Sequence, residues 1–132
     1  MIYGIGTDIV DYNQLRTAIE RSGQRLIDRI FTPAEQTKCK ARVDPIPCFS
    51  SRFAAKEAVS KALRLGIFKA GLTNIEVLNR ADGSPYIVIG EGLAAKIPQF
   101  EHMRFHLSLT DGQAQAIAFA VIEITLPGQP AG

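Results

Sequence analysis

The sequence predicts one domain of the α+β class, with a mainly antiparallel sheet packed on one long helix. Helical patterns fill most of the first half of the chain, and strand patterns fill most of the second half. The chain has 132 residues, which is the size of a single domain and enough to bury a core without disulfide or metal supports. We expect the domain to span residues 1–126 and residues 127–132 to form a disordered tail.

The first half reads as one strand followed by short helices. Apolar residues and two glycines predict a strand over residues 1–10. Helices are expected over residues 12–21 and 24–31, separated by Gly23. A capping box, Thr32-Pro33-Ala34-Glu35, predicts that a short and mostly polar helix begins there.

The longest helix is expected over residues 49–65, after a proline-containing linker at residues 44–47. One of its faces is rich in alanine, which would let the helix lie close against a sheet. The apolar face would hold Ala54, Ala55, Ala58, Val59, Ala62 and Leu63, and the polar side Arg52, Lys56, Glu57, Ser60, Lys61 and Arg64.

Strand patterns separated by turn signals make up the second half. The expected elements are strands at 74–79 and 86–89 around a turn at 81–85, a short helix at 92–97, and a hairpin of strands at 104–110 and 114–124 around Asp111-Gly112.

The sequence contains no apparent membrane-spanning or signal segment. No apolar run approaches the roughly 20 residues of a membrane span, and the N-terminus lacks the basic and apolar regions of a signal peptide. We therefore expect a cytoplasmic protein with no membrane partner. Cys39 and Cys48 do not form a CxxC pair and no histidine is close to them in sequence, so we expect free thiols rather than a metal site.

The charge is distributed unevenly, although the net charge is only +2. Residues 16–69 carry 12 Lys and Arg against 5 Asp and Glu, whereas residues 70–132 carry 3 against 6. A basic first half indicates an anionic partner or ligand. Nucleic acid, an acidic protein and a polyphosphate are all candidates.

Three acidic and basic residues are candidates for chemistry. Asp8 lies near the end of the first strand, where it could cap a helix, form a salt bridge or bind a cation. Glu57 and Lys61 are one helical turn apart, in the order that favours a surface ion pair. If Asp8 and Glu57 came together, their carboxylates would suit Mg²⁺, and Lys61 would suit a phosphate.

His106, Ser108 and Thr110 alternate with apolar residues and should share one face of a strand. Such a face could bind phosphate oxygens, or it could simply be solvated. No GxSxG surrounds Ser108, so a serine-hydrolase mechanism has only weak support. Neither GxGxxG nor GxxxxGK[ST] occurs, so the usual nucleotide-binding loops are absent.

Five segments together resemble the bacterial holo-acyl-carrier-protein synthases, a family of 4'-phosphopantetheinyl transferases. The resemblance spans nearly the whole chain, in order and at family length. The matching segments are Gly4-Ile5-Gly6-Thr7-Asp8-Ile9-Val10, Arg29-Ile30-Phe31-Thr32-Pro33-Ala34-Glu35, Arg52-Phe53-Ala54-Ala55-Lys56-Glu57-Ala58 with Ser60-Lys61-Ala62, Asp82-Gly83-Ser84-Pro85-Tyr86, and His106-Leu107-Ser108-Leu109-Thr110-Asp111.

The resemblance implies the fold of that family and a homotrimer with active sites at the subunit interfaces. It implies an Mg²⁺-dependent enzyme that moves phosphopantetheine from coenzyme A onto a serine of an apo acyl carrier protein, for fatty acid biosynthesis, and releases 3',5'-ADP. Asp8, Glu57 and Lys61 would be catalytic, and the general base is left open between Glu57 and a water on the metal.

The resemblance also implies the binding roles. Asp8 and Glu57 would hold Mg²⁺, Lys61 the pyrophosphate, Arg52, His106 and Ser108 the 3'-phosphate end of the nucleotide, Gly66, Pro85 and Thr110 other parts of the coenzyme A site, and Arg16, Arg21 and Arg25 the acidic helix of the carrier protein.

Two positions depart from the family pattern, and two other classes of function are alternatives. Arg64-Leu65-Gly66 stands where many members have Gly-Thr-Gly, and Asp111 stands where many have His. A nucleic-acid-binding module would explain the basic half, but its basic residues lie on predicted helices, and Phe105 and Phe119 are expected in the core. A non-catalytic trimeric scaffold would not need the three candidate catalytic residues.

Overall fold

The computed structural model describes residues 1–66 and 71–128. Along the chain, the elements are β1 (Ile2–Asp11), α1 (Tyr12–Ser22), α2 (Gln24–Ile30), α3 (Pro33–Lys40), α4 (Ile46–Ala62), the 3₁₀-helix η1 (Leu72–Asn74), β2 (Ile75–Asn79), β3 (Pro85–Ile89), α6 (Glu91–Ala94), the 3₁₀-helix η2 (Phe100–His102), β4 (Met103–Asp111) and β5 (Gln115–Ile124).

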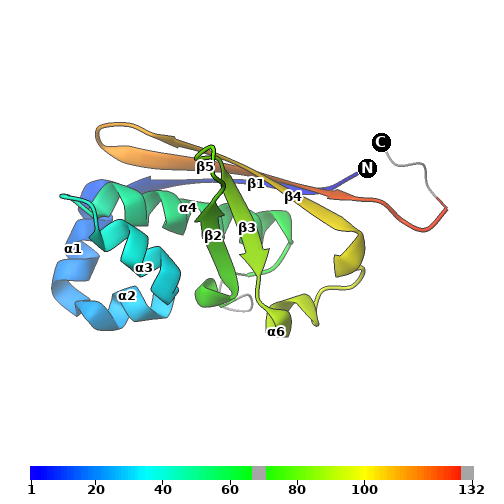
Figure 1. Cartoon of the computed structure of the whole chain (residues 1–132), viewed down its shortest axis with the longest axis horizontal. Coiled ribbons are helices and arrows are strands. Elements are labelled where there is room, and N and C mark those ends of the chain that lie inside the picture. Colours follow the sequence, from blue (N-terminus) through cyan, green and yellow to red (C-terminus); the bar gives the residue numbers. More distant parts are fainter. Residues whose placement is uncertain (67–70, 129–132) are drawn as a thin grey trace.

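Two antiparallel sheets form the β part of the fold. The larger has three strands in the order β1-β5-β4, so the first strand of the chain pairs with the last. Asp8 lies opposite Ala118 in this register, and Ser108 lies opposite Phe119. The smaller sheet is the hairpin of β2 and β3 (Figure 1). Both predicted hairpins and the α+β class are confirmed.

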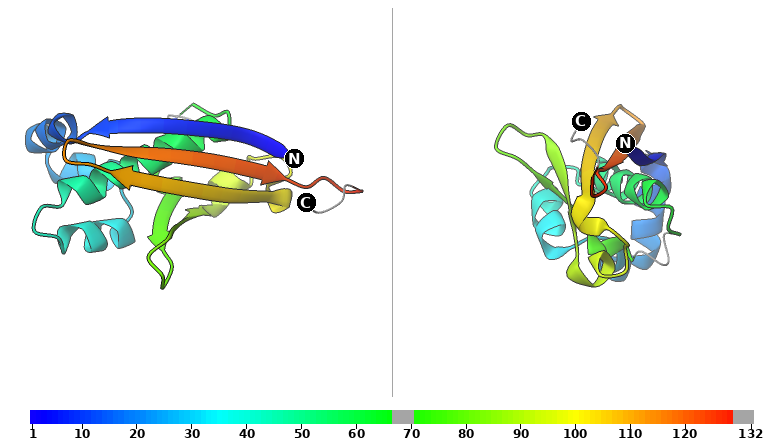
Figure 2. Two further views of the ribbon diagram at one scale, coloured as in Figure 1. Left: turned by 90° about the horizontal axis from the view of Figure 1, so that it is seen from above. Right: turned by 90° about the vertical axis from the view of Figure 1, so that its right-hand side faces the viewer.

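The long helix α4 lies along one face of the three-stranded sheet, with α1, α2 and α3 gathered at one end of it (Figures 1 and 2). The helix approaches β1 very closely because glycine and alanine meet there. A Cβ atom added to Gly4 would overlap the carbonyl oxygen of Ala62, and one added to Gly6 would overlap that of Ala58. The predicted close packing of an alanine-rich helix on a sheet is thereby confirmed.

The helix α4 is buried on both sides, which corrects the prediction of a polar, outward-facing side. Its alanines pack on the sheet, while Lys56, Ser60 and Arg52 are buried on other faces. The reason is tertiary: α3 and β2 also contact this helix and cover the face that a two-layer arrangement would leave in water. None of the helices among the described residues is long and apolar enough to cross a membrane.

The predicted helix boundaries hold within a few residues. The capping box at the start of α3 is confirmed, because Thr32 Oγ1 accepts from Glu35 N–H and the Glu35 carboxylate accepts from Thr32 N–H. The start of α4 was placed too late, since the helix begins at Ile46 and includes Pro47. Proline is tolerated in a first turn because its missing N–H would have no helical partner there.

Cys39 and Cys48 form a disulfide, which corrects the prediction of free thiols. Cys39 lies in the last turn of α3 and is fully buried, and Cys48 lies in the first turn of α4, with a Cα–Cα separation of 5.3 Å. This separation lies within the range that a disulfide spans. Their spacing in the sequence did not indicate a bridge, whereas the packing of α3 against α4 brings them together.

The outer face of the three-stranded sheet is apolar and exposed. Ile5 and Ile9 are 62% and 56% exposed, and Phe119, which we had expected in the core, is 47% exposed. Figure 2 (left) looks onto this face, and no described helix covers it. Of the predicted tail, residues 129–132 lie outside the described residues.

Candidate active site

Three of the predicted catalytic residues surround one cavity of about 400 Å³ between β1 and α4. Asp8 comes from the inward face of β1, and Glu57 and Lys61 come from α4, one helical turn apart. The remaining wall consists of Ser60, Leu65 and Gly66. The structure therefore brings together Asp8, Glu57, Lys61 and Gly66 of the predicted site residues.

The Asp8 carboxylate is largely buried, with 12% of its side chain exposed. Its Oδ1 atom accepts a hydrogen bond from Lys61 Nζ at 3.1 Å, and the same ammonium group donates to the Thr7 carbonyl oxygen at 2.9 Å. Lys61 thus pairs with Asp8 rather than forming the helical surface pair with Glu57. Asp8 does not cap a helix either, because Asp11 caps α1.

The pKa of Glu57 is raised to about 8, from an ordinary value of 4.5. Burial of the carboxyl group is the largest cause, followed by the neighbouring Asp8 carboxyl, while the Lys61 ammonium acts in the opposite direction. Two carboxyl groups this close do not both ionise readily unless a cation compensates them. Such a perturbed acid in a cavity is typical of a functional site.

The pair of carboxyl groups fits a divalent cation. Asp8 Oδ2 is buried and has no hydrogen-bond partner among the described residues, so it is free to act as an oxygen ligand. Mg²⁺ commonly takes one or two carboxylates and completes its octahedron with substrate phosphates and water. No cluster of three or more His, Cys, Asp or Glu suited to a metal occurs in residues 1–66 or 71–128.

Arg52 lines a second cavity, of about 230 Å³, together with Arg42, Cys48 and Asp111. Its side chain is buried, and Nη2 donates to Asn79 Oδ1 at 2.7 Å, while Nε has no partner among the described residues. Burial lowers the pKa of this guanidinium. Pro85 lies opposite Asn79 in the β2–β3 pair and is therefore on the same side of the molecule as Arg52.

His106, Ser108 and Thr110 are exposed on the outer face of the sheet, as their alternation predicted. That face is opposite the one on which Asp8 meets α4. His106 Nε2 pairs with Glu123 Oε1 at 2.5 Å on the neighbouring strand. Within one chain, these polar residues are therefore not brought to the cavity that holds Asp8 and Glu57.

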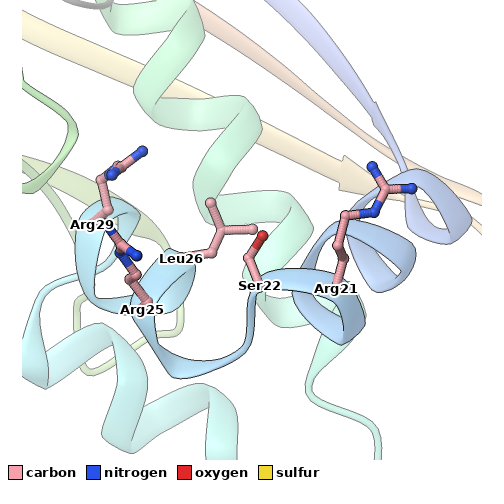
Figure 3. A pocket seen from close by; sticks show the side chains of 5 residues that line it. All are labelled: Arg21, Ser22, Arg25, Leu26 and Arg29. Atoms are coloured by element: carbon pink, nitrogen blue, oxygen red, sulfur yellow. The ribbon is translucent and has the colours of Figure 1, made fainter.

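The predicted partner-binding arginines divide into two sets. Arg21 and Arg25 line a surface cavity of about 400 Å³ with Ser22, Leu26 and Arg29. Figure 3 shows Arg25 and Arg29 on one helix and Arg21 across the cavity on the preceding one. Arg16 lies elsewhere and forms an ion pair with Asp44 at 2.8 Å.

Sequence reasoning missed two features of this region. Arg29 was not predicted to bind the partner, although its spacing of four residues from Arg25 places both on one helix face. Glu35 was interpreted as a capping residue, but it also forms a fully buried ion pair with Lys56. No local pattern indicates that pair, because its partners lie on different helices.

The chain is similar to proteins of one superfamily over most of its length. Residues 4–121 match the 4'-phosphopantetheinyl transferase superfamily. A holo-[acyl-carrier-protein] synthase of Methylorubrum populi is 40% identical over 128 residues, covering 93% of this chain and 94% of the relative.

Two crystal structures of such synthases have the same fold. The one from Neisseria meningitidis matches with a TM-score of 0.86 and 36% identity, over 93% of this chain and 99% of the other. The one from Bacillus anthracis, described in complex with CoA (3',5'-ADP), matches with a TM-score of 0.77 and 31% identity, over 95% and 99%. This chain belongs to the 4'-phosphopantetheinyl transferase superfamily.

Proposed function

We propose that this protein transfers the 4'-phosphopantetheine group of coenzyme A to a serine of an apo acyl carrier protein, for use in fatty acid biosynthesis. The products are holo acyl carrier protein and 3',5'-ADP. The observation that carries the proposal is the convergence of Asp8, Glu57 and Lys61 on one cavity, in a chain of this superfamily. The name of the Methylorubrum relative and the ligand of the Bacillus structure support both substrates.

The enzyme has to stabilise charge in this reaction, and it need not supply a nucleophile, because the carrier protein provides one. The serine hydroxyl of the carrier protein attacks the β-phosphorus of coenzyme A, and 3',5'-ADP leaves with the electron pair of the broken P–O bond. Negative charge on the phosphoryl oxygens must be stabilised as the bond breaks. Lys61 is suited to this task, because its ammonium group is at the cavity and more than half exposed.

Mg²⁺ is the cofactor that the two carboxyl groups fit. Asp8 and Glu57 would hold the ion, which would supply charge stabilisation at the phosphates. Asp8 Oδ2 would be the ligand atom on the strand, because Lys61 Nζ already pairs with Oδ1. In the absence of a cation, the raised pKa of Glu57 keeps this carboxyl group protonated over part of the neutral range.

Glu57 is also a candidate for accepting the proton of the attacking serine. A general base works best when its pKa is near the working pH, and the pKa of about 8 meets that condition before a cation binds. A cation ligated by the same carboxylate would lower its basicity. A water molecule is then the alternative acceptor.

The arginine cavity is the proposed docking site for the carrier protein. Arg21, Arg25 and Arg29 place three guanidinium groups around one cavity, with Leu26 as an apolar contact (Figure 3). Such a surface suits an acidic helix. Arg16 is also assigned to this contact, although its pairing with Asp44 would have to be exchanged for a partner carboxylate.

A homotrimer would explain the exposed outer face of the sheet. Ile5, Ile9 and Phe119 present apolar surface there, and exposed apolar patches mark interaction surfaces. His106 and Ser108 share that face, so a neighbouring copy seated on it could bring them to its own coenzyme A. Sedimentation analysis tests the trimer, and a stable monomer would contradict it.

The remaining assignments follow from the same arrangement. Arg52, His106 and Ser108 would bind the 3'-phosphate end of the nucleotide, and Gly66, Pro85 and Thr110 would line the rest of the coenzyme A site. One domain over residues 1–126 and a cytoplasmic location, without nucleic acid or membrane as partners, stay predictions.

Mass spectrometry of an apo acyl carrier protein tests the function. The carrier should gain one phosphopantetheine group after incubation with this protein, coenzyme A and Mg²⁺, and no group when EDTA is present. Asp8→Ala and Glu57→Ala should abolish the gain while the protein stays folded, whereas Glu91→Ala, at an exposed acid of α6, should not. An unmodified carrier would reject the function, and salt-sensitive binding of random DNA would then favour a nucleic-acid module.

A further inference from the structure

The most deeply buried charges of the described residues are those of Glu35 and Lys56. Both side chains have 0% exposure, and Lys56 Nζ lies 2.6 Å from Glu35 Oε1. The pair joins α3 to the middle of α4, next to Glu57 in the sequence. It takes no part in the proposed chemistry, because neither residue lines the cavity of Asp8 and Glu57.

The polar atoms of the two charged groups have partners. Besides Glu35, Lys56 Nζ donates to the carbonyl oxygens of Leu72 at 2.9 Å and Ile75 at 2.6 Å. Glu35 Oε1 accepts from Thr32 N–H at 2.9 Å, and Oε2 accepts from Val77 N–H at 2.8 Å. These directional contacts tie α4 to α3, to η1 and to β2.

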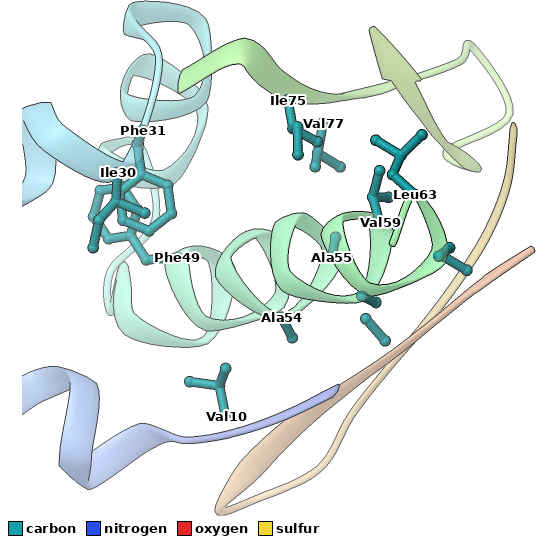
Figure 4. Close-up of a cluster of buried hydrophobic side chains, with 14 of the residues drawn as sticks. Val10, Ile30, Phe31, Phe49, Ala54, Ala55, Val59, Leu63, Ile75 and Val77 are labelled. Carbon is teal, nitrogen blue, oxygen red and sulfur yellow. The ribbon is translucent and has the colours of Figure 1, made fainter. Parts of the chain in front are cut away.

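Apolar packing sets how closely α4 approaches the sheet, and polar contacts can fix its rotation. The face of α4 toward the sheet consists of small alanines, which allow the close contact with the glycines of β1. On the other side lie Ile75 and Val77 of β2, as Figure 4 shows. Burial energy is not directional, whereas hydrogen bonds to fixed carbonyl oxygens are.

Glu57 follows Lys56 directly and so lies about 100° further around the helix. A small rotation or shift of α4 that released Lys56 would therefore displace Glu57 relative to Asp8 on β1. Displacement by about 1 Å can lower a catalytic rate by roughly 100-fold.

We propose that the buried Glu35–Lys56 pair is a positioning device, which sets the orientation of α4 and so holds the Glu57 carboxylate opposite Asp8. The proposal rests on the proposed function, since it assigns both residues to the support of the same site. Lys56 and Glu35 are positioning residues here and do not contact the substrate.

The test compares Lys56→Met with the double variant Glu35→Gln/Lys56→Met. The single variant leaves a buried carboxylate without its cation and should be much less stable. The double variant removes both charges, so its stability should largely recover, because paired buried charges are often replaceable without loss. We expect its kcat to remain 10- to 100-fold below wild type, with KM for coenzyme A changed by less than about threefold.

A second readout does not need turnover. Binding of Mn²⁺, as a paramagnetic substitute for Mg²⁺, is measured by electron paramagnetic resonance without coenzyme A. The double variant should bind Mn²⁺ at least about tenfold more weakly, because its two carboxylates are no longer aligned. Val59→Ala is the matched control: it removes buried volume from the same helix, and it should lower stability but leave kcat and Mn²⁺ binding within about twofold.

The outcomes separate the two proposals. A double variant that recovers kcat and Mn²⁺ binding together with stability would show a purely structural pair and overturn the positioning role. A wild-type protein that modifies no carrier protein would reject the proposed function, and Mn²⁺ binding would still decide whether the pair aligns the carboxylates.

Discussion

Gly6 of β1 lies directly against the backbone of Ala58 in α4, so closely that a single methyl group on Gly6 would overlap the Ala58 carbonyl oxygen. Both residues of this contact are close in the sequence to a carboxylate of the site. Asp8 is two residues after Gly6 on the strand, and Glu57 immediately precedes Ala58 on the helix. The closeness of strand and helix at this point therefore sets how near Asp8 comes to Glu57.

Gly6→Ala should accordingly damage both the fold and the site. The obstructing atom belongs to the backbone, so the helix has to move away from the strand. Overpacking of this kind typically costs about 1–3 kcal/mol of unfolding free energy, and denaturant unfolding measures it. Gly92→Ala is the control, because a Cβ there meets nothing within 4 Å. Equal stability of both variants would show that the helix has room to adapt.

The stability of the metal-free protein should fall as pH rises. The pKa of Glu57 is raised from 4.5 to about 8, mainly by burial and then by Asp8. Between these values the folded state holds a proton that the unfolded state has released, so the free energy of unfolding decreases up to about pH 8 and this contribution then stays constant. Thermal unfolding with EDTA over this pH range is the measurement, and Glu57→Gln should remove this component.

Mg²⁺ binding below pH 8 should release a proton, because the ion needs the ionised carboxylate. Calorimetry in two buffers of different ionisation enthalpy counts the released protons. About one proton is expected in wild type and none in Glu57→Gln. Binding without proton release in the wild type would place the ion elsewhere.

Charge reversal in the arginine cavity should weaken recognition of the carrier protein selectively. Arg25→Glu is expected to raise KM for the carrier roughly tenfold and reduce its dependence on salt, while KM for coenzyme A stays unchanged. Arg21→Glu should act in the same way, since it lines the same cavity. Lys96→Glu, at an exposed position near α6, provides a reversal of the same size as control. An equal rise in KM for the carrier in all three variants would show that only the net charge of the protein governs recognition.

Arg64 adopts a left-handed conformation, with φ of 63°, just after α4. Its guanidinium donates to the Tyr3 carbonyl oxygen at 2.6 Å and lies over the Tyr3 ring. Arg64→Ala loses these contacts and keeps the backbone strain, whereas Arg64→Gly loses the contacts and relieves the strain. The glycine variant should therefore be the more stable of the two by about 1 kcal/mol. Equal denaturant midpoints would contradict this account.

The disulfide between Cys39 and Cys48 should stabilise the domain measurably. It closes a short loop, with a sequence separation of 9, which corresponds to about 2–3 kcal/mol in the chain-entropy treatment. Reductant should lower the thermal midpoint of the wild type, and it should leave a Cys39→Ala/Cys48→Ala variant unaffected. Thiol labelling of the unfolded, non-reduced protein reports whether the bond is formed, and two labelled thiols would reject it.

Local signals determined much of what the sequence alone predicted correctly. The capping box at Thr32 and Glu35 was predictable because both partners lie within one helical turn. The outward row of His106, Ser108 and Thr110 was predictable from strand alternation. Asp8, Glu57 and Lys61 were identified as candidates from their chemistry and from the family motifs that contain them.

Contacts between distant segments decided the rest. Lys61 has Glu57 one turn away but pairs with Asp8, 53 residues away in the sequence. Lys56 carries a charge that a helical pattern places in water, yet α3, η1 and β2 enclose it. A sequence shows which groups each segment carries, but burial, ion-pair choice and disulfide pairing depend on which segments pack together. These features are properties of the tertiary structure, because the partners come together only when the sheet and α3 pack against α4.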